Sequence, residues 1–107
     1  MKVNLGGEGE APGAINQQGP WVLDPLWRST REGKTLKQLQ TEGHRFVISN
    51  NLQLPFQNDS VEEVITNNVP IDRITWLGPG VQSKEIHRIL KPGGHWVHDA
   101  AIRFTKP

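Results

Sequence analysis

Glycines crowd the segment that follows the first apolar run of this chain. The run extends from Val3 to Leu5, and four of the next eight residues are glycine, namely Gly6, Gly7, Gly9 and Gly13. A short apolar run that ends in glycines predicts a buried strand leading into a glycine-rich loop. Glycine suits positions where the backbone takes a positive φ angle or where a ligand comes close to the main chain. The first elements are therefore expected to be a strand and a loop nearly free of side chains.

Two further segments have the pattern of short helices. Residues 34–42 contain good helix formers and are followed by Gly43, the residue type preferred just past a helix end. A second helix is predicted to begin with Ser83 as its cap and to stop before Pro92. Both helices are expected to span only a few turns.

Short extended segments surround these helices. Residues 44–49 contain a continuous apolar triplet that suits a strand covered on both faces. Further strands are predicted at 61–66 and, as one two-sided strand, at 95–104, with shorter extended pieces at 14–16 and 21–23. Strands joined through helices favour a parallel sheet with right-handed crossovers. We therefore predict one α/β domain over residues 1–107, with a small, mostly parallel sheet and few helices.

Composition excludes several classes of protein. The chain has no cysteine, so it has no disulfide framework, no thiolate zinc site and no cysteine nucleophile. No stretch is long and apolar enough for a membrane span, and the first residues have no apolar signal-peptide core. The net charge of +1 provides no global attraction to nucleic acid or anionic lipid. A soluble domain is expected.

The histidines do not predict a metal site. His95 and His98 lie three residues apart on a predicted strand and would point to opposite faces, and their spacing is not that of a zinc signature. No metal is therefore predicted from them. Glu8 and Glu10 lie in the glycine-rich loop, where they could be solvated, act as a general base or coordinate a metal.

Three phrases in the second half of the chain resemble class I S-adenosylmethionine-dependent methyltransferases. They are Leu54-Pro55-Phe56, the run from Asp59 to Val64, and the run from Glu85 to Gly94. The glycine-rich start resembles the first motif of that family, in a form without the usual long helix. The resemblance implies a small Rossmann-like fold that binds S-adenosylmethionine or a nucleotide-like ligand.

The resemblance also assigns roles to individual residues. Cofactor-binding roles fall on the loop glycines and on three later positions: Gly6, Gly7, Gly9, Gln17, Asn51 and Leu52. Asn67 or Asp72 would face the substrate, because members of the family that methylate nitrogen have a polar residue followed by proline after the fourth strand. The run Asn67-Asn68-Val69-Pro70 equally suits a turn that ends a strand.

The chain departs from the family pattern at three places. Gln17 and Gln18 stand near the position where the family offers an acidic residue to the ribose hydroxyls. Asn50 and Asn51 stand near the position of the Asp beside the adenine. The sequence also stops after the last predicted strand, so the family's terminal strand hairpin is expected to be missing.

The short length and the tail Thr105-Lys106-Pro107 are similar to methyltransferase-like effector domains at the C-terminal ends of bacterial polymorphic toxins, of the contact-dependent inhibition or Rhs type. This resemblance implies delivery into the cytoplasm of a target cell and a cognate immunity protein as partner. We expect a monomer.

Two other functions fit the residues. A toxin ribonuclease would use His98 as general acid or base with Asp99 and Arg103, acting on RNA. A non-catalytic binding module needs none of these residues. Trp27 and Trp76 lie in predicted loops, where they could stack on a base, contact a partner or cover the core.

Overall fold

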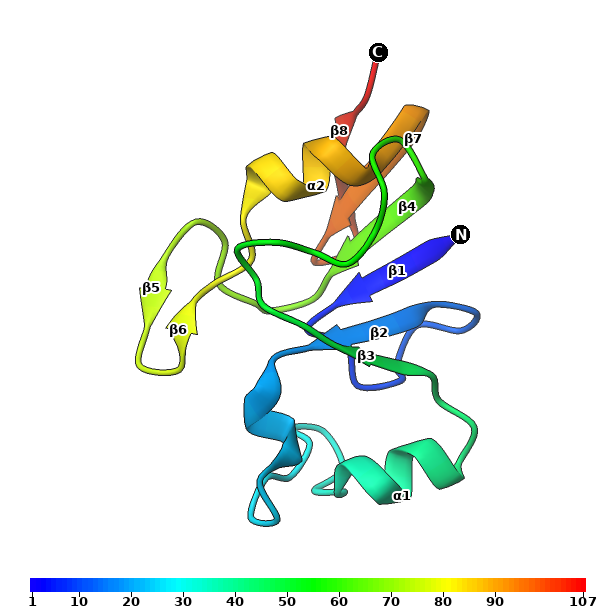
Figure 1. The fold of residues 1–107 in the computed structure, drawn as a ribbon. Helices are drawn as coiled ribbons and strands as arrows, with labels where there is room; N and C mark the ends of the chain where they lie inside the picture. Colours follow the sequence, from blue (N-terminus) through cyan, green and yellow to red (C-terminus); the bar gives the residue numbers. More distant parts are fainter.

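A twisted sheet runs through the centre of the molecule, with few helices around it (Figure 1). The computed structural model describes residues 1–107. The strands of this sheet are β1 (Lys2–Leu5), β2 (Ile15–Gln18), β3 (Phe46–Ile48), β4 (Val61–Thr66), β7 (Leu90–His98) and β8 (Ala101–Thr105). Their order across the sheet is β3-β2-β1-β4-β7-β8.

All neighbouring strands are parallel except the last pair. Strand β1 lies between β2 and β4 and is parallel to both, and the pairs β2–β3 and β4–β7 are also parallel. Only β8 runs antiparallel, beside β7. The predicted α/β class, with a small, mostly parallel sheet and few helices, is confirmed.

Five short elements connect the strands of the sheet. They are the 3-10 helix η1 (Pro20–Leu23), helix α1 (Leu36–Thr41), strand β5 (Ile74–Thr75), strand β6 (Gly78–Pro79) and helix α2 (Ser83–Ile89). Strands β5 and β6 form a separate two-stranded hairpin. Both α-helices lie where helices were predicted. Neither has the length or the apolar character needed to cross a membrane.

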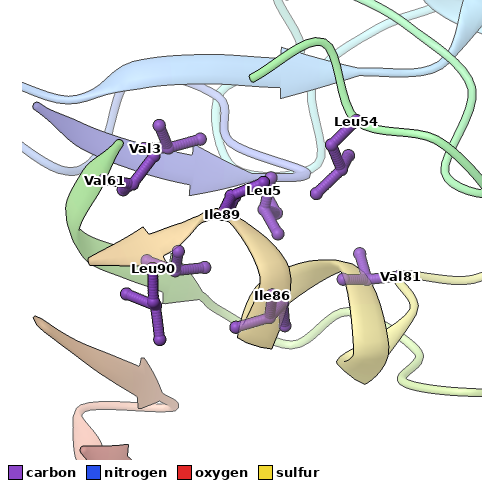
Figure 2. Packing of buried hydrophobic residues seen from close by; sticks show 9 residues of the cluster. Val3, Leu5, Leu54, Val61, Val81, Ile86, Ile89 and Leu90 are labelled. Carbon is purple, nitrogen blue, oxygen red and sulfur yellow. The ribbon is translucent and has the colours of Figure 1, made fainter. Parts of the chain in front are cut away.

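The apolar core lies between one face of the sheet and α2. Side chains from β1 and α2, including Leu5 and Ile89, meet there, and Leu54 joins them from the segment before β4 (Figure 2). The cluster consists of nine buried residues: Val3, Leu5, Leu54, Val61, Val64, Val81, Ile86, Ile89 and Leu90. Val3 and Leu5 are alternate residues of β1 and so point to the same face. Val61 and Val64 are three apart on β4, where the register shifts between Val61 and Glu63.

The opposite face of β1 and β2 is polar but equally buried. Asn4 is paired in register with Asn16, and both are almost completely buried, as is Gln18. The glycine-rich loop between the two strands covers these amides. Asn16 Oδ1 accepts a hydrogen bond of 3.0 Å from the Gly9 N–H, and Gln18 Nε2 donates one of 3.0 Å to the Gly7 carbonyl. Buried amides need such partners, so the loop takes the place of a covering helix.

Gly7 shows how closely the loop approaches these amides. A Cβ atom at this position would lie 2.4 Å from Asn16 Oδ1 and 2.7 Å from Asn4 Cγ. No side chain fits there without moving a buried neighbour. Glycine is therefore required at position 7 by packing.

The helices begin in two different ways. Thr35 caps α1, because its side chain accepts from the Gln38 N–H while the Gln38 side chain accepts from the Thr35 N–H. The prediction that Ser83 caps α2 is wrong, since the cap position is Gln82 and its side chain makes no cap bond. The carboxylate of Asp72 instead accepts from the Ser83 N–H at 2.9 Å and from its hydroxyl at 2.6 Å. A distant loop thus satisfies the helix start.

Two predictions about the extended segments near β2 and β3 are wrong. Strand β3 is at the edge of the sheet and half-buried, so it is not covered on both faces. An apolar triplet has the same pattern in a central and in an edge strand, which is why the position was missed. Residues 21–23 belong to η1 because Pro20, with its fixed φ, begins a helical turn. The piece at 14–16 overlaps β2 as expected.

The single strand predicted at 95–104 is also wrong. The chain reverses at Asp99 and Ala100, which have φ angles of 49° and 66°, and β8 then pairs antiparallel with β7. A two-residue loop with both φ angles positive makes a tight hairpin. The usual Asn-Gly or Asp-Gly signal is absent, and apolar residues continue on both sides of the turn, so the reversal was not visible in the pattern.

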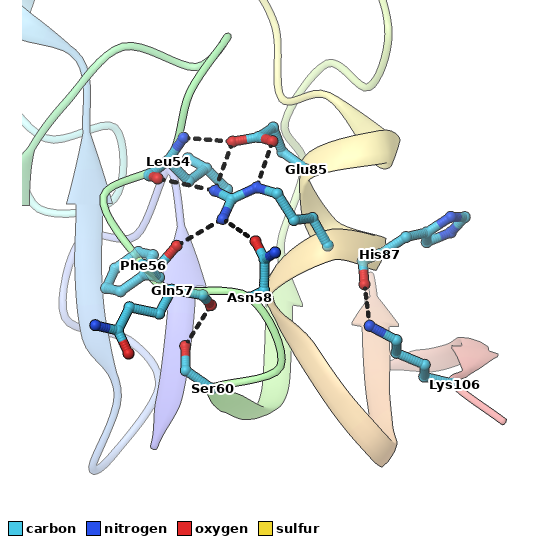
Figure 3. A network of polar contacts seen from close by, with 9 residues as sticks. Leu54, Phe56, Gln57, Asn58, Ser60, Glu85, His87 and Lys106 are labelled. Carbon is cyan, nitrogen blue, oxygen red and sulfur yellow. Dashed lines mark hydrogen bonds and ion pairs between the residues drawn. The ribbon is translucent and has the colours of Figure 1, made fainter.

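A partly buried ion pair attaches the segment before β4 to helix α2 (Figure 3). Arg88 donates to both oxygens of Glu85, at 2.7 and 2.9 Å, and to the carbonyls of Leu54 and Phe56, at 3.0 and 2.8 Å. Glu85 Oε1 also accepts from the Leu54 N–H at 2.7 Å. The ion pair therefore supplies backbone partners for a segment without regular structure.

The end of the chain contacts the end of the same helix. Lys106 Nζ donates to the His87 carbonyl at 2.9 Å (Figure 3). It also donates to the Leu90 carbonyl at 2.8 Å and forms an ion pair with Asp59 at 2.6 Å. A lysine that binds the last carbonyls of a helix stabilises its terminus. Strand β8 is thereby joined to α2.

We predict that Arg88→Ala lowers the free energy of unfolding by about 2 kcal/mol, because the Glu85 carboxylate and two backbone carbonyls lose their donor. The value is below that for a fully buried pair because the Arg88 side chain is 30% exposed. Urea denaturation measures the change. Arg103→Ala is the matched control, since the Arg103 side chain is exposed and makes no hydrogen bond or ion pair, and it should cost less than about 0.5 kcal/mol. Equal losses in the two variants would contradict the prediction.

Candidate functional site

The principal cavity lies at the carboxyl ends of the central strands. It has a volume of about 530 Å³, and its lining includes Gly6 after β1, Gln17 and Gln18 at the end of β2, and Asn67 after β4. The hairpin β5–β6 and the loop after η1 complete the wall. The strand order reverses at β1, because β2 lies on one side of it and β4 lies on the other. Ligands of open parallel sheets bind at this point.

Gly6 lines this cavity next to the end of β1. Its φ of 69° allows its N–H to donate to the Gln17 carbonyl at 2.7 Å. A Cβ at Gly6 would lie 2.6 Å from a methyl carbon of Val69, another lining residue. Both the backbone angle and the space therefore require glycine.

Glu10 connects the loop after β1 with the segment after β4. Its Oε2 accepts from Asn4 Nδ2 at 2.7 Å and from Asn67 Nδ2 at 2.9 Å, and its Oε1 accepts from the Glu8 N–H at 2.8 Å. Burial by itself would raise the pKa of the Glu10 carboxyl, but the hydrogen bonds from Asn4, Asn67 and the backbone outweigh it and hold this pKa below its ordinary value of 4.5. The side chain is therefore a carboxylate near neutral pH.

Glu8 draws a second loop toward the cavity. Its carboxylate accepts from the Thr30 N–H at 3.1 Å and from the Thr30 hydroxyl at 2.9 Å. The loop held in this way contributes Trp27 and Arg31 to the lining. An aromatic ring and a cation thus stand beside two carboxylates.

Amides join the remaining wall of the cavity. Gln17 Nε2 donates to Asn51 Oδ1 at 3.1 Å and to Ser49 Oγ at 3.1 Å, and Asn51 Nδ2 donates to the Pro79 carbonyl at 2.9 Å. These bonds connect the end of β2, the segment after β3 and strand β6. The two amides are therefore fixed before any ligand enters.

The structure brings four of the predicted site residues to the cavity: Gly6, Gln17, Asn51 and Asn67. Gly7 and Gly9 lie in the same loop but pack against Asn16 and His44. Leu52 is 50% exposed and is not part of the lining. Asp72 contacts the start of α2, as described above. Gly7, Gly9, Leu52 and Asp72 therefore do not line the cavity.

The three residues of the nuclease hypothesis are only partly together. His98 Nε2 lies 3.2 Å from Asp99 Oδ2, and His98 Nδ1 is 2.7 Å from the Thr66 hydroxyl. Asp99 Oδ1 accepts from the Asn68 N–H at 2.6 Å, which puts the pair beside the cavity wall. Arg103 makes no contact with this pair through a hydrogen bond or an ion pair.

The sequence does not predict several residues that line the cavity, among them Gln18, Thr30 and Arg31. Gln18 is expected only near the position of the family's acidic residue. Trp27 was proposed for stacking, and its position beside Arg28 was the available signal; nothing in the sequence indicated that Glu8 would bring its loop to β1.

No group of three or more histidine or acidic side chains in the structure is arranged to hold a metal ion. No protein-family model matches the chain, and neither a curated protein nor a solved structure matches it.

We predict that Glu10 makes the free energy of unfolding depend on pH. Because the pKa of its carboxyl is below 4.5 in the folded state, Glu10 contributes stability above the unfolded-state pKa, and this contribution is lost as the pH falls through the folded-state value. The difference in unfolding free energy between wild type and Glu10→Gln should shrink from about pH 6 to about pH 3. Urea titrations at several pH values measure it. A difference that does not change with pH would contradict the prediction.

Proposed function

We propose that this chain is a small Rossmann-like, methyltransferase-type domain whose cavity binds S-adenosylmethionine or a related nucleoside. The observation that carries the proposal is the position of the cavity at the carboxyl ends of β1, β2 and β4, where the strand order reverses. Its volume of about 530 Å³ is also typical of a small-molecule site.

The sheet supports a Rossmann-like interpretation. If the five parallel strands are numbered along the chain, their order is 3-2-1-4-5, as in the doubly wound nucleotide-binding folds. The fold departs from that type on one face, where the glycine-rich loop takes the place of the first helix. This departure agrees with the resemblance of the chain to a shortened methyltransferase.

The residues around the cavity fit a nucleoside. Gly6 offers bare backbone beneath the ligand, Asn51 stands where the resemblance expects the base, and Trp27 provides a face for stacking. Gln18 is 5% exposed, and its Oε1 accepts no hydrogen bond within the chain, so it can receive a ribose hydroxyl. The amide replaces the family's acid without its charge.

Methyl transfer requires little chemistry from the protein. S-Adenosylmethionine supplies an electrophilic methyl group on a sulfonium. The chain has to hold the ligand and the acceptor in line, and Asn67 is the polar residue best placed to contact the acceptor. The accepting atom gains the methyl group and releases a proton, while S-adenosylhomocysteine leaves with the bonding electron pair.

We extend the proposal to the biological context implied by the second resemblance. The domain would be the effector module of a bacterial polymorphic toxin, and it would act in the cytoplasm of a target cell. An immunity protein would be its specific partner.

We predict that S-adenosylmethionine binds the purified domain in isothermal titration calorimetry. Trp27→Ala should weaken binding about tenfold, because a stacking face is lost. Trp76→Ala is the matched control, since Trp76 is 92% exposed and does not line the cavity. The absence of heat with a folded sample at millimolar ligand would refute the cofactor proposal.

A ribonuclease is the second candidate, favoured by the His98–Asp99 pair beside the cavity. In that case the domain should degrade RNA, and His98→Ala should reduce cleavage by at least about 100-fold because the general acid or base is lost. Degradation of purified transfer RNA measures this, with His44→Ala as control. Unchanged cleavage in the His98 variant would remove the candidate, and a protein that binds neither ligand would be a non-catalytic module.

A further inference from the structure

The hydrogen-bonding direction of the Asn67 amide is set by its partner. Glu10 is a carboxylate, and a carboxylate can only accept hydrogen bonds. The group that faces it at 2.9 Å must therefore be the NH2 of Asn67. The side-chain oxygen of Asn67, Oδ1, accepts no hydrogen bond within the chain, and Asn67 lines the cavity.

Asn4 demonstrates how strongly Glu10 imposes this direction. The Asn4 NH2 also donates to Glu10, at 2.7 Å, and Asn4 Oδ1 is left fully buried without a partner. An unpartnered buried acceptor destabilises the fold. The arrangement persists because the Glu10 carboxylate accepts a hydrogen bond from the NH2 group of Asn4 and another from that of Asn67.

A second acceptor in the cavity is fixed in the same manner. The Gln18 NH2 donates to the Gly7 carbonyl at 3.0 Å, which leaves Gln18 Oε1 as the free atom. Gln18 is 5% exposed and lines the cavity. One amide at the end of β2 and one just after β4 thus present oxygen atoms, with their NH2 groups already used.

We propose that Glu10 is a positioning residue which, by holding the NH2 of Asn67, gives this part of the cavity an acceptor-only character and selects ligands that carry an ammonium or N–H donor. The inference rests on the proposed function, because it takes the cavity to be a nucleoside site. Glu10 acts through Asn67.

A pair of nucleosides that differ in one group tests the proposal. The probes are 5′-amino-5′-deoxyadenosine and 5′-deoxyadenosine, and the measured quantity is the ratio of their dissociation constants from calorimetry at pH 7. We expect the wild type to bind the amino compound about tenfold more tightly, which is typical of one charge-assisted hydrogen bond. A merely structural role for Glu10 would change both affinities and leave the ratio intact.

Two variants separate positioning from direct charge attraction. In Glu10→Gln the new amide can donate as well as accept, so Asn67 can turn its NH2 toward the cavity, and the ratio should fall to within about twofold of unity. Asn67→Ala keeps the Glu10 carboxylate but removes the acceptor, and the ratio should fall in the same way. Glu62→Gln makes the same change of charge at the start of β4, away from the cavity, and should keep the wild-type ratio. Thermal unfolding checks that each variant is folded.

The outcomes are distinct. If the wild type binds neither nucleoside, the nucleoside proposal fails and the inference fails with it. If it binds both equally, the cavity accepts nucleosides but the inference is wrong. If the ratio survives Asn67→Ala and disappears in Glu10→Gln, Glu10 contacts the ligand itself, and the positioning role is overturned.

Discussion

The structure depends on the buried amides on one face of β1 and β2. Asn4, Asn16 and Gln18 point away from the apolar core, yet all three are at most 5% exposed. Buried amides are costly unless their donors and acceptors are paired, and a helix with an apolar face could not pair them. A loop with free backbone groups can. The chain after β1 therefore folds back over its own strand, and this path places Glu8 and Glu10 at the cavity.

The cavity is consequently built from hydrogen bonds between segments that are far apart in sequence. Glu10 connects the loops after β1 and β4, Glu8 brings in the loop that contains Thr30, and Asn51 connects the segment after β3 with β6. The ion pair between Arg88 and Glu85 likewise connects distant segments on the other side of the sheet, where it supports the segment before β4. Short elements with few apolar contacts are thus held by polar groups.

Some residues that the family resemblance assigned to ligand binding have an evident role in the fold instead. Gly7 lies against the buried amides of Asn4 and Asn16, Gly9 lies against the His44 ring, and Asp72 satisfies the start of α2. Motif positions alone cannot distinguish these two demands on the same residue type. A glycine that lies next to a ligand and a glycine that lies next to a buried amide look the same in the sequence.

The sequence alone determined the α/β class, the parallel character of the sheet and the approximate positions of both helices, because hydrophobic periodicity and Gly43 or Pro92 act locally. Tertiary structure alone decided that β3 is at an edge, that the chain turns at Asp99 and that Asp72 satisfies a helix start. It also decided which amides face the cavity and in which direction their oxygens point. These properties depend on partners distant in the chain, and a pattern of neighbouring residues contains no information about which distant group will supply the missing hydrogen bond.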